Sequence, residues 1–111
     1  MTKVVRNSDL QTAPGVIEFE GAGYGSGVSF YITENEQGAG PGLHRHPYPE
    51  TFILLEGNAA FTVDGKSIAA ATGSVIVVPA NTPHRFVNAG PGSLHIISIH
   101  PSSRFQQEDI T

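Results

Sequence analysis

Apolar residues recur along this chain at short intervals, and many of them alternate with polar ones. In segment 28–33, Val28, Phe30 and Ile32 alternate with more polar neighbours. A period of two is the pattern of a strand with one face on a core. Such runs, ended by glycine or proline, predict about nine short strands and almost no helix. The predicted strands are residues 16–20, 28–33, 43–46, 51–56, 59–63, 66–70, 74–78, 84–87 and 94–100.

Turn signals separate these runs. Asp64-Gly65 lies between two of them and is a strong signal for a hairpin, and Pro91-Gly92 marks another turn. The chain has 13 glycines and 8 prolines in 111 residues. This spacing of short strands favours an all-β barrel or sandwich over an α/β layout. The tail differs, because residues 104–110 are predicted to hold a helical turn.

Two of the predicted strands, residues 51–56 and 74–78, are apolar on both faces. We expect one face to fill the barrel and the other to need separate cover, which predicts a homodimer; cover by a second sheet of the same chain is the alternative. The residues expected to point inward are Phe52, Leu54, Val75 and Val77, and those expected outward are Ile53, Leu55, Ile76 and Val78.

Composition sets limits on the class of protein. The length predicts one domain over residues 1–111. No apolar run approaches the length of a membrane span, and the N-terminal residues lack the apolar core of a secretory signal. The chain has no cysteine, and we expect a cytoplasmic protein. A net charge of −4 with only six Lys and Arg argues against a nucleic-acid partner.

Three histidines and one glutamate indicate a metal site. His44 and His46 are two residues apart, so on a strand they point to the same face. Glu50 opens the next apolar run, and His84 follows about forty residues later. A hairpin-rich fold can bring all four together. Imidazole and carboxylate ligands suit Mn²⁺, Fe²⁺, Ni²⁺, Co²⁺ or Zn²⁺, and no thiolate competes for a softer ion.

The segments that carry these residues resemble the two signature motifs of the cupin superfamily, in its small single-domain branch. The first motif is G-x5-H-x-H-x3-E-x6-G, and the second is G-x5-P-x-G-x2-H-x3-N. The second has Asn81 where the family usually has glycine, and Asn tolerates positive φ better than other non-glycine residues do. The matching residues are Gly38, His44, His46, Glu50 and Gly57, then Gly73, Pro79, His84 and Asn88. The resemblance implies a jelly-roll barrel with a metal ion in its mouth, and it implies no single reaction.

Further site residues are predicted around this metal. His100 shares a strand face with Ile96 and Ser98, whereas His95 lies on the opposite face, so at most one of the two histidines points inward. His100 and Tyr48 are the candidate catalytic residues, although a water-exposed strand end for His100 and a half-packed loop position for Tyr48 stay open. The expected pocket-lining residues are Phe30, Phe52, Leu54, Phe86, Ile96 and Ser98. Such a pocket would suit a small, partly apolar ligand.

Two classes of function follow. Four protein ligands leave open positions on a five- or six-coordinate ion, which favours an enzyme over a structural site. The first hypothesis is a dioxygenase-type oxidoreductase that uses Mn²⁺ or Fe²⁺ on a small chelating molecule; lyase, isomerase and cyclase chemistry are alternatives. The second is a non-catalytic module that binds a metal and a ligand.

Overall fold

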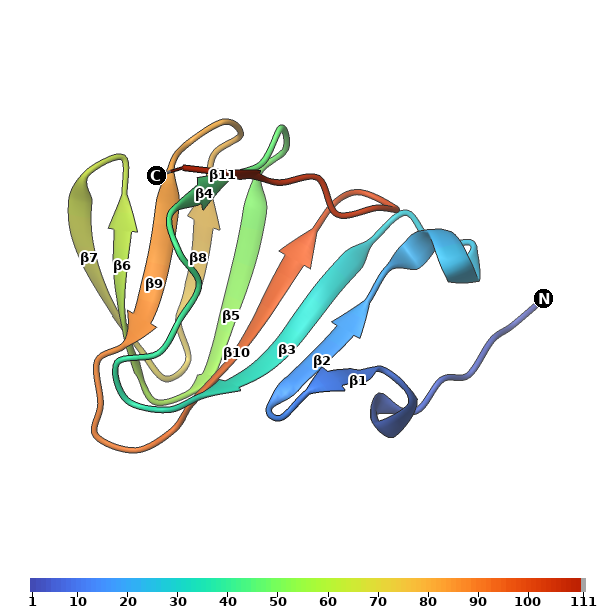
Figure 1. Ribbon diagram of the computed structural model, residues 1–111, viewed down its shortest axis with the longest axis horizontal. Helices are drawn as coiled ribbons and strands as arrows, with labels where there is room; N and C mark the ends of the chain where they lie inside the picture. Colours follow the sequence, from blue (N-terminus) through green and yellow to red (C-terminus); the bar gives the residue numbers. More distant parts are fainter. Residues whose placement is uncertain (111) are drawn as a thin grey trace.

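The computed structural model describes residues 1–110, which form two antiparallel sheets packed face to face (Figure 1). The strands of the six-stranded sheet are, in spatial order, β1 (Gln11–Ala13), β2 (Val16–Phe19), β3 (Ser29–Asn35), β10 (Leu94–His100), β5 (Glu50–Glu56) and β8 (Val75–Val78). Those of the five-stranded sheet are β11 (Glu108–Asp109), β4 (His44–Arg45), β9 (His84–Asn88), β6 (Asn58–Val63) and β7 (Lys66–Ala71). Two short 3₁₀ helices, η1 (Asn7–Asp9) and η2 (Gly21–Tyr24), lie near the N-terminus. This is the all-β jelly-roll arrangement that the sequence predicts.

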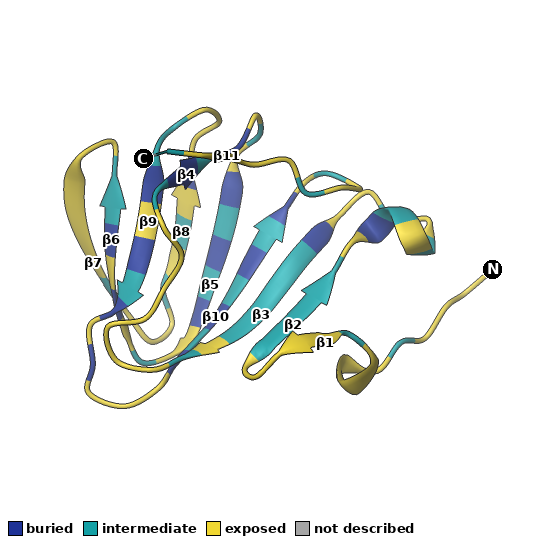
Figure 2. Cartoon of the chain, viewed as in Figure 1, coloured by how far each residue is buried: buried dark blue, intermediate teal, exposed yellow. Residues whose placement is uncertain are grey.

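The core lies between the two sheets, as the dark bands on the central strands of Figure 2 show. On β10 every second residue from Leu94 to His100 is buried. The rings of Phe52, Phe61 and Phe86 form an aromatic cluster with centroid separations of 5.1 to 5.6 Å. Each such side chain contributes about 1.5–3 kcal/mol by leaving water. The other buried apolar residues are Leu54, Ala59, Val78, Leu94 and Ile96.

Local turn chemistry agrees with the sequence at two points. Asp64 and Gly65 both have positive φ, 50° and 77°, and join β6 to β7 as a tight hairpin. Asn81 has φ of 60°, so the turn of the second motif keeps its left-handed conformation without glycine. This turn places His84 at the first position of β9.

The predicted orientation of β8 is wrong. Phe52 of β5 points into the core, and its partner across the ladder is Ile76. Directly opposed residues share a face, so Ile76 and Val78 point inward while Val75 and Val77 point outward, with 64% and 61% of their surface exposed. A continuous apolar run carries no alternation that could fix this choice, and only the pairing with β5 decides it.

The predicted helical turn at 104–110 is also wrong. Residues 108 and 109 instead form β11, which pairs with β4 through Glu108 opposite Arg45 and Asp109 opposite His44. The Ile110 amide donates to the carbonyl of Leu43 at 2.9 Å, which extends the pairing. The tail therefore lies against the strand that carries the metal-ligand candidate His44 and ends just before His46. The short strand β1 was not predicted, because its residues are all exposed and show no alternation.

Among residues 1–110, no helix has the length and apolar character needed to cross a bilayer.

Candidate metal centre

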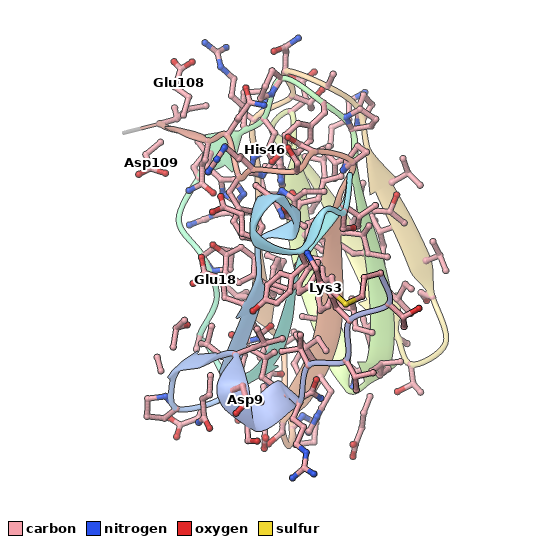
Figure 3. All side chains as sticks on the ribbon, turned by 90° about the vertical axis from the view of Figure 1, so that its right-hand side faces the viewer. Lys3, Asp9, Glu18, His46, Glu108 and Asp109 are labelled. Carbon is pink, nitrogen blue, oxygen red and sulfur yellow. The ribbon has the colours of Figure 1, made fainter. Side chains whose placement is uncertain are left out.

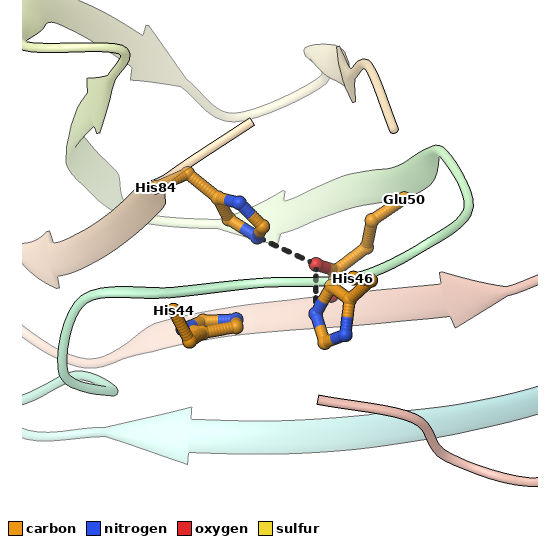
Figure 4. A group of neighbouring side chains, drawn as sticks. All are labelled: His44, His46, Glu50 and His84. Carbon is orange, nitrogen blue, oxygen red and sulfur yellow. Dashed lines mark hydrogen bonds and ion pairs between the residues drawn. The ribbon is translucent and has the colours of Figure 1, made fainter. Parts of the chain in front are cut away.

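Three elements and one turn bring the predicted ligands together. His44 lies on β4, His46 just beyond it, and Glu50 and His84 open β5 and β9. His44 pairs directly with His84 across the β4–β9 ladder. The four side chains are buried, and one ligand atom from each lies within 4.8 Å of the others. Figure 4 shows the imidazoles of the three histidines gathered around the carboxylate of Glu50.

Main-chain carbonyls fix the orientation of all three imidazoles. The Nδ1 atom of His44 lies 2.7 Å from the Gly42 carbonyl, and that of His84 lies 2.8 Å from the Thr82 carbonyl. The Nδ1 atom of His46 is 2.8 Å from the carbonyl of Gln106. Because a carbonyl only accepts, each Nδ1 must carry the proton and donate. Each neutral ring then offers the lone pair of Nε2 to the centre of the cluster, as a metal ligand requires.

The acceptor atoms of these side chains lie close together at the centre of the cluster, an arrangement that a bound cation would stabilise. Glu50 Oε1 lies 2.8 Å from His84 Nε2 and 3.0 Å from His46 Nε2. His46 Nε2 is buried and has no partner in hydrogen-bond geometry. With each Nδ1 protonated, these three atoms are acceptors held at close range, and only a proton or a metal ion between them relieves the repulsion. The donor set fits a divalent metal, so His44, His46, Glu50 and His84 form a metal-binding site.

The charge state of Glu50 suits this role. Burial raises the pKa of its carboxyl, but close contacts with the imidazoles of His100, His46 and His84 outweigh burial and hold that pKa well below its usual range. Burial lowers the pKa of His44. At neutral pH the site therefore offers an ionised carboxylate and a neutral His44 imidazole, which are the protonation states that bind metal.

Tyr48 and His100 form a chain that ends on the same carboxylate. Tyr48 Oη lies 2.7 Å from His100 Nδ1, and His100 Nε2 lies 3.1 Å from Glu50 Oε2, outside strict hydrogen-bond geometry. The tyrosine hydroxyl also accepts a 3.3 Å hydrogen bond from the Gln106 amide. His100 is buried, so the structure places it inside the barrel, whereas His95 lies on the outer face between Glu34 and Glu56.

A cavity of about 300 Å³ adjoins the cluster, and Glu50, His44 and His100 form part of its wall. Of the predicted pocket-lining residues, Phe52, Phe86 and Ser98 lie on this wall. Leu54 and Ile96 are instead fully buried in the core. Phe30 lies on the other face of β3, where its ring stacks on that of Phe19 at a centroid distance of 4.8 Å.

Several other wall residues were not predicted from the sequence. On β3 Phe30 was expected to line the pocket, but Tyr31 and Thr33 line the cavity instead. Alternation identifies two faces without saying which is inside, and a polar cavity reverses the usual choice. Gln107 also lines the cavity, from the tail. Figure 3 shows the tail residues Glu108 and Asp109 at the same end of the molecule as His46.

The sequence model of the cupin domain family matches residues 30–100 of this chain. These residues are more than half of the chain, and the protein belongs to the cupin family. An uncharacterised protein of Methanocaldococcus jannaschii is 34% identical over 56 residues. That match covers 50% of this chain and 45% of the archaeal protein, so the chain spans about half the length of this relative.

Solved structures share the fold at low identity. Oxalate decarboxylase from Bacillus subtilis superposes with a TM-score of 0.77 at 23% identity, over 86% of this chain and 27% of that protein. An oxalate oxidase gives a TM-score of 0.74 at 19% identity, over 89% and 57% of the two chains. A Streptococcus pyogenes protein of unknown function gives 0.61 at 23% identity, over 67% and 63%. At these identities the likeness establishes the fold.

Proposed function

We propose that this cupin is a metal-dependent oxidoreductase of the dioxygenase type that acts on a small organic molecule. The observation that carries this proposal is that Glu50 and His44 form part of the cavity wall. A metal ion held by these side chains would therefore face a cavity large enough for a small ligand. A structural metal site is usually closed by its protein ligands, whereas this site adjoins open space.

Mn²⁺ and Fe²⁺ are the favoured ions. The oxalate decarboxylase of Bacillus subtilis, which shares the fold, has Mn(II) centres. Either ion, when bound, would hold an oxidisable substrate and O₂ next to each other and ease the transfer of electrons between them. In a dioxygenase reaction both oxygen atoms enter the substrate, which supplies all the electrons, so no external reductant is needed.

His100 is the proposed catalytic acid or base, because it lines the cavity and is buried beside Glu50. Its Nδ1 contacts the Tyr48 hydroxyl at 2.7 Å, which fixes the orientation of the ring. Tyr48 does not line the cavity, so it is a positioning residue that acts through His100. Its hydroxyl contacts the Gln106 amide as well, which ties this chain of side chains to the tail.

The test is oxygen uptake by manganese- or iron-loaded protein with a panel of enols, diketones, catechols and thiols. The proposal expects O₂ consumption in proportion to substrate loss, with none in metal-free protein. Turnover that continues under argon would replace it with lyase or isomerase chemistry. Ligand binding without any turnover would identify a non-catalytic binding module.

Two variants separate the proposed roles. His100→Gln should lower kcat by about 10²–10⁴, the usual contribution of a general acid or base, while leaving metal content unchanged. Tyr48→Phe should shift the pH profile of kcat with a smaller loss of rate, because it removes the contact to His100 Nδ1 and the hydrogen bond from the Gln106 amide but keeps the His100 imidazole. Equal turnover by His100→Gln and the parent protein would remove His100 from the mechanism.

We also propose that two copies pair through the outer face of the six-stranded sheet. Ile97 of β10 lies opposite Ile32 of β3 and Ile53 of β5, and Ile53 lies opposite Val75 of β8. These four residues form an apolar row across four neighbouring strands on the side away from the core. Val77 and Leu55 beside the row are 61% and 50% exposed. A second copy of the same face would cover this surface by two-fold pairing.

A further inference from the structure

None of the residues that line the cavity beside the metal site, within the described part of the chain (1–110), is a lysine or an arginine. Its wall among residues 1–110 is made of four apolar residues, five uncharged polar residues and three ionisable ones that belong to the metal site or contact it. The apolar residues are Val16, Pro41, Phe52 and Phe86; the uncharged polar residues are Tyr31, Thr33, Asn35, Ser98 and Gln107; the ionisable residues are His44, Glu50 and His100. Tyr31 counts as uncharged because burial and the neighbouring Glu18 raise its pKa to about 12.

The cations nearest to the ligands in sequence point away from the cavity. Arg45 lies between two ligand histidines, and its side chain pairs with Glu108 at 3.0 Å on the surface. Arg85 follows His84 on β9 and is exposed. Successive residues of a strand face opposite sides, so the spacing that turns the imidazoles inward turns these guanidinium groups outward.

The charge of the site then depends on the ion and one carboxylate. A divalent ion with Glu50 and three neutral imidazoles carries a net charge of +1, by counting 2 − 1. A ligand with one negative charge makes this buried group neutral. A ligand with two negative charges leaves one unit of uncompensated charge beside a wall that, among residues 1–110, supplies no lysine or arginine to pair with it, which is costly to bury.

We infer that the cavity selects a small ligand that chelates the metal as a single negative charge through two oxygen atoms, and that it discriminates against dianions such as oxalate. This inference deepens the proposed function, and it rests on the metal site of that proposal. The body of the ligand would lie against a wall that includes Phe52, Phe86 and the hydroxyl-bearing residues Thr33 and Ser98. A flat, uncharged body with an apolar side suits these walls.

The test measures binding and needs no turnover. Manganese-loaded protein is titrated under argon by calorimetry with tropolonate, a singly charged O,O chelator with an apolar ring, and with oxalate. The ratio of the two dissociation constants is compared with the same ratio for aqueous Mn²⁺. We expect binding in the protein to shift this ratio in favour of tropolonate by roughly tenfold or more, because only the dianion leaves a charge uncompensated in the site. An unchanged ratio, or a shift toward oxalate, would overturn it.

A matched pair of variants places a charge on the wall. Thr33→Arg supplies a cation inside the cavity, and Thr33→Gln supplies a neutral side chain of intermediate length at the same position. Thr33→Arg should move the ratio back toward oxalate by about tenfold, and Thr33→Gln should leave it near the parent value. Equal ratios in the two variants would contradict the charge argument. If the parent binds tropolonate selectively but consumes no O₂ with any substrate, the proposed function fails and this inference stands.

Discussion

The Nδ1 atom of His46 donates a 2.8 Å hydrogen bond to the main-chain carbonyl of Gln106, which lies 60 residues further along the chain. The tail that carries this carbonyl is held by the pairing of β11 with β4. A ring oriented in this way presents Nε2 to the metal site without rotating. The tail is therefore part of the metal centre, although it contributes no ligand.

Removal of the tail should weaken metal binding. A chain that ends at Arg104 loses the Gln106 carbonyl and β11, and metal affinity should fall by about 10–100-fold, as for other partners of ligand histidines. Glu108→Ala is the matched control, because it removes only the exposed ion pair with Arg45 and should change affinity little. Isothermal titration with Mn²⁺ measures both. Equal affinities for the truncated and parent chains would contradict the role given to the tail.

Chelation should lower the melting temperature. An ion that binds only the folded state at 100 times its dissociation constant stabilises it by about 2.7 kcal/mol, which corresponds to a shift of about 10 °C for a chain of this size. The circular dichroism spectrum should stay all-β. His46→Ala should melt alike with and without added metal, whereas His95→Ala, which changes a histidine on the outer face, should respond as the parent does. A parent protein insensitive to chelator would argue against a tight site.

Metal affinity should rise with pH. Burial lowers the pKa of His46, but its contacts with Glu50 and the Gln106 carbonyl raise it more, so the net shift is above the ordinary value of 6.5. In the metal-free protein His46 therefore takes up a proton above pH 6.5, and metal must displace this proton. Metal affinity is therefore fully present above the raised pKa of His46 and is lost as the pH falls through that pKa. Titrations between pH 5.5 and 8.5 that gave one constant affinity would contradict this reasoning.

Val77→Glu should convert the proposed dimer into a monomer. Val77 is 61% exposed beside the apolar row on the six-stranded sheet, and a carboxylate there would be buried at the interface. Ala69→Glu is the control, since Ala69 is exposed on β7 of the other sheet and lies opposite the exposed Ala60. Light scattering at micromolar concentration should give a dimer mass for the parent and the Ala69 variant and a monomer mass for the Val77 variant. A parent that stays monomeric on concentration would contradict the dimer.

The sequence predicted the fold and the metal ligands because both rest on short-range signals. Strand alternation, the Asp64-Gly65 turn and the spacing of His44, His46 and Glu50 are local patterns. These patterns fix which residues share a face. Asn81 adopts the positive φ that was expected of it.

The errors in the orientation of β8 and in the tail concern long-range pairing. The inward face of β8 is set by the register of Ile76 against Phe52, and the strand at Glu108 forms only because β4 is there to pair with it. Tyr31 lines the cavity although its neighbours in sequence are more apolar. None of these pairings leaves a mark in the local sequence, since residues far apart in the chain determine them.

A crystal structure of manganese-loaded protein, with anomalous scattering recorded at the manganese edge, would show directly whether His44, His46, Glu50 and His84 hold one divalent metal ion. We expect one anomalous peak within about 2.0–2.4 Å of an Nε2 atom of each histidine and of an oxygen of Glu50. A peak elsewhere, or one with any of these four side chains turned away from it, would rule out this metal site.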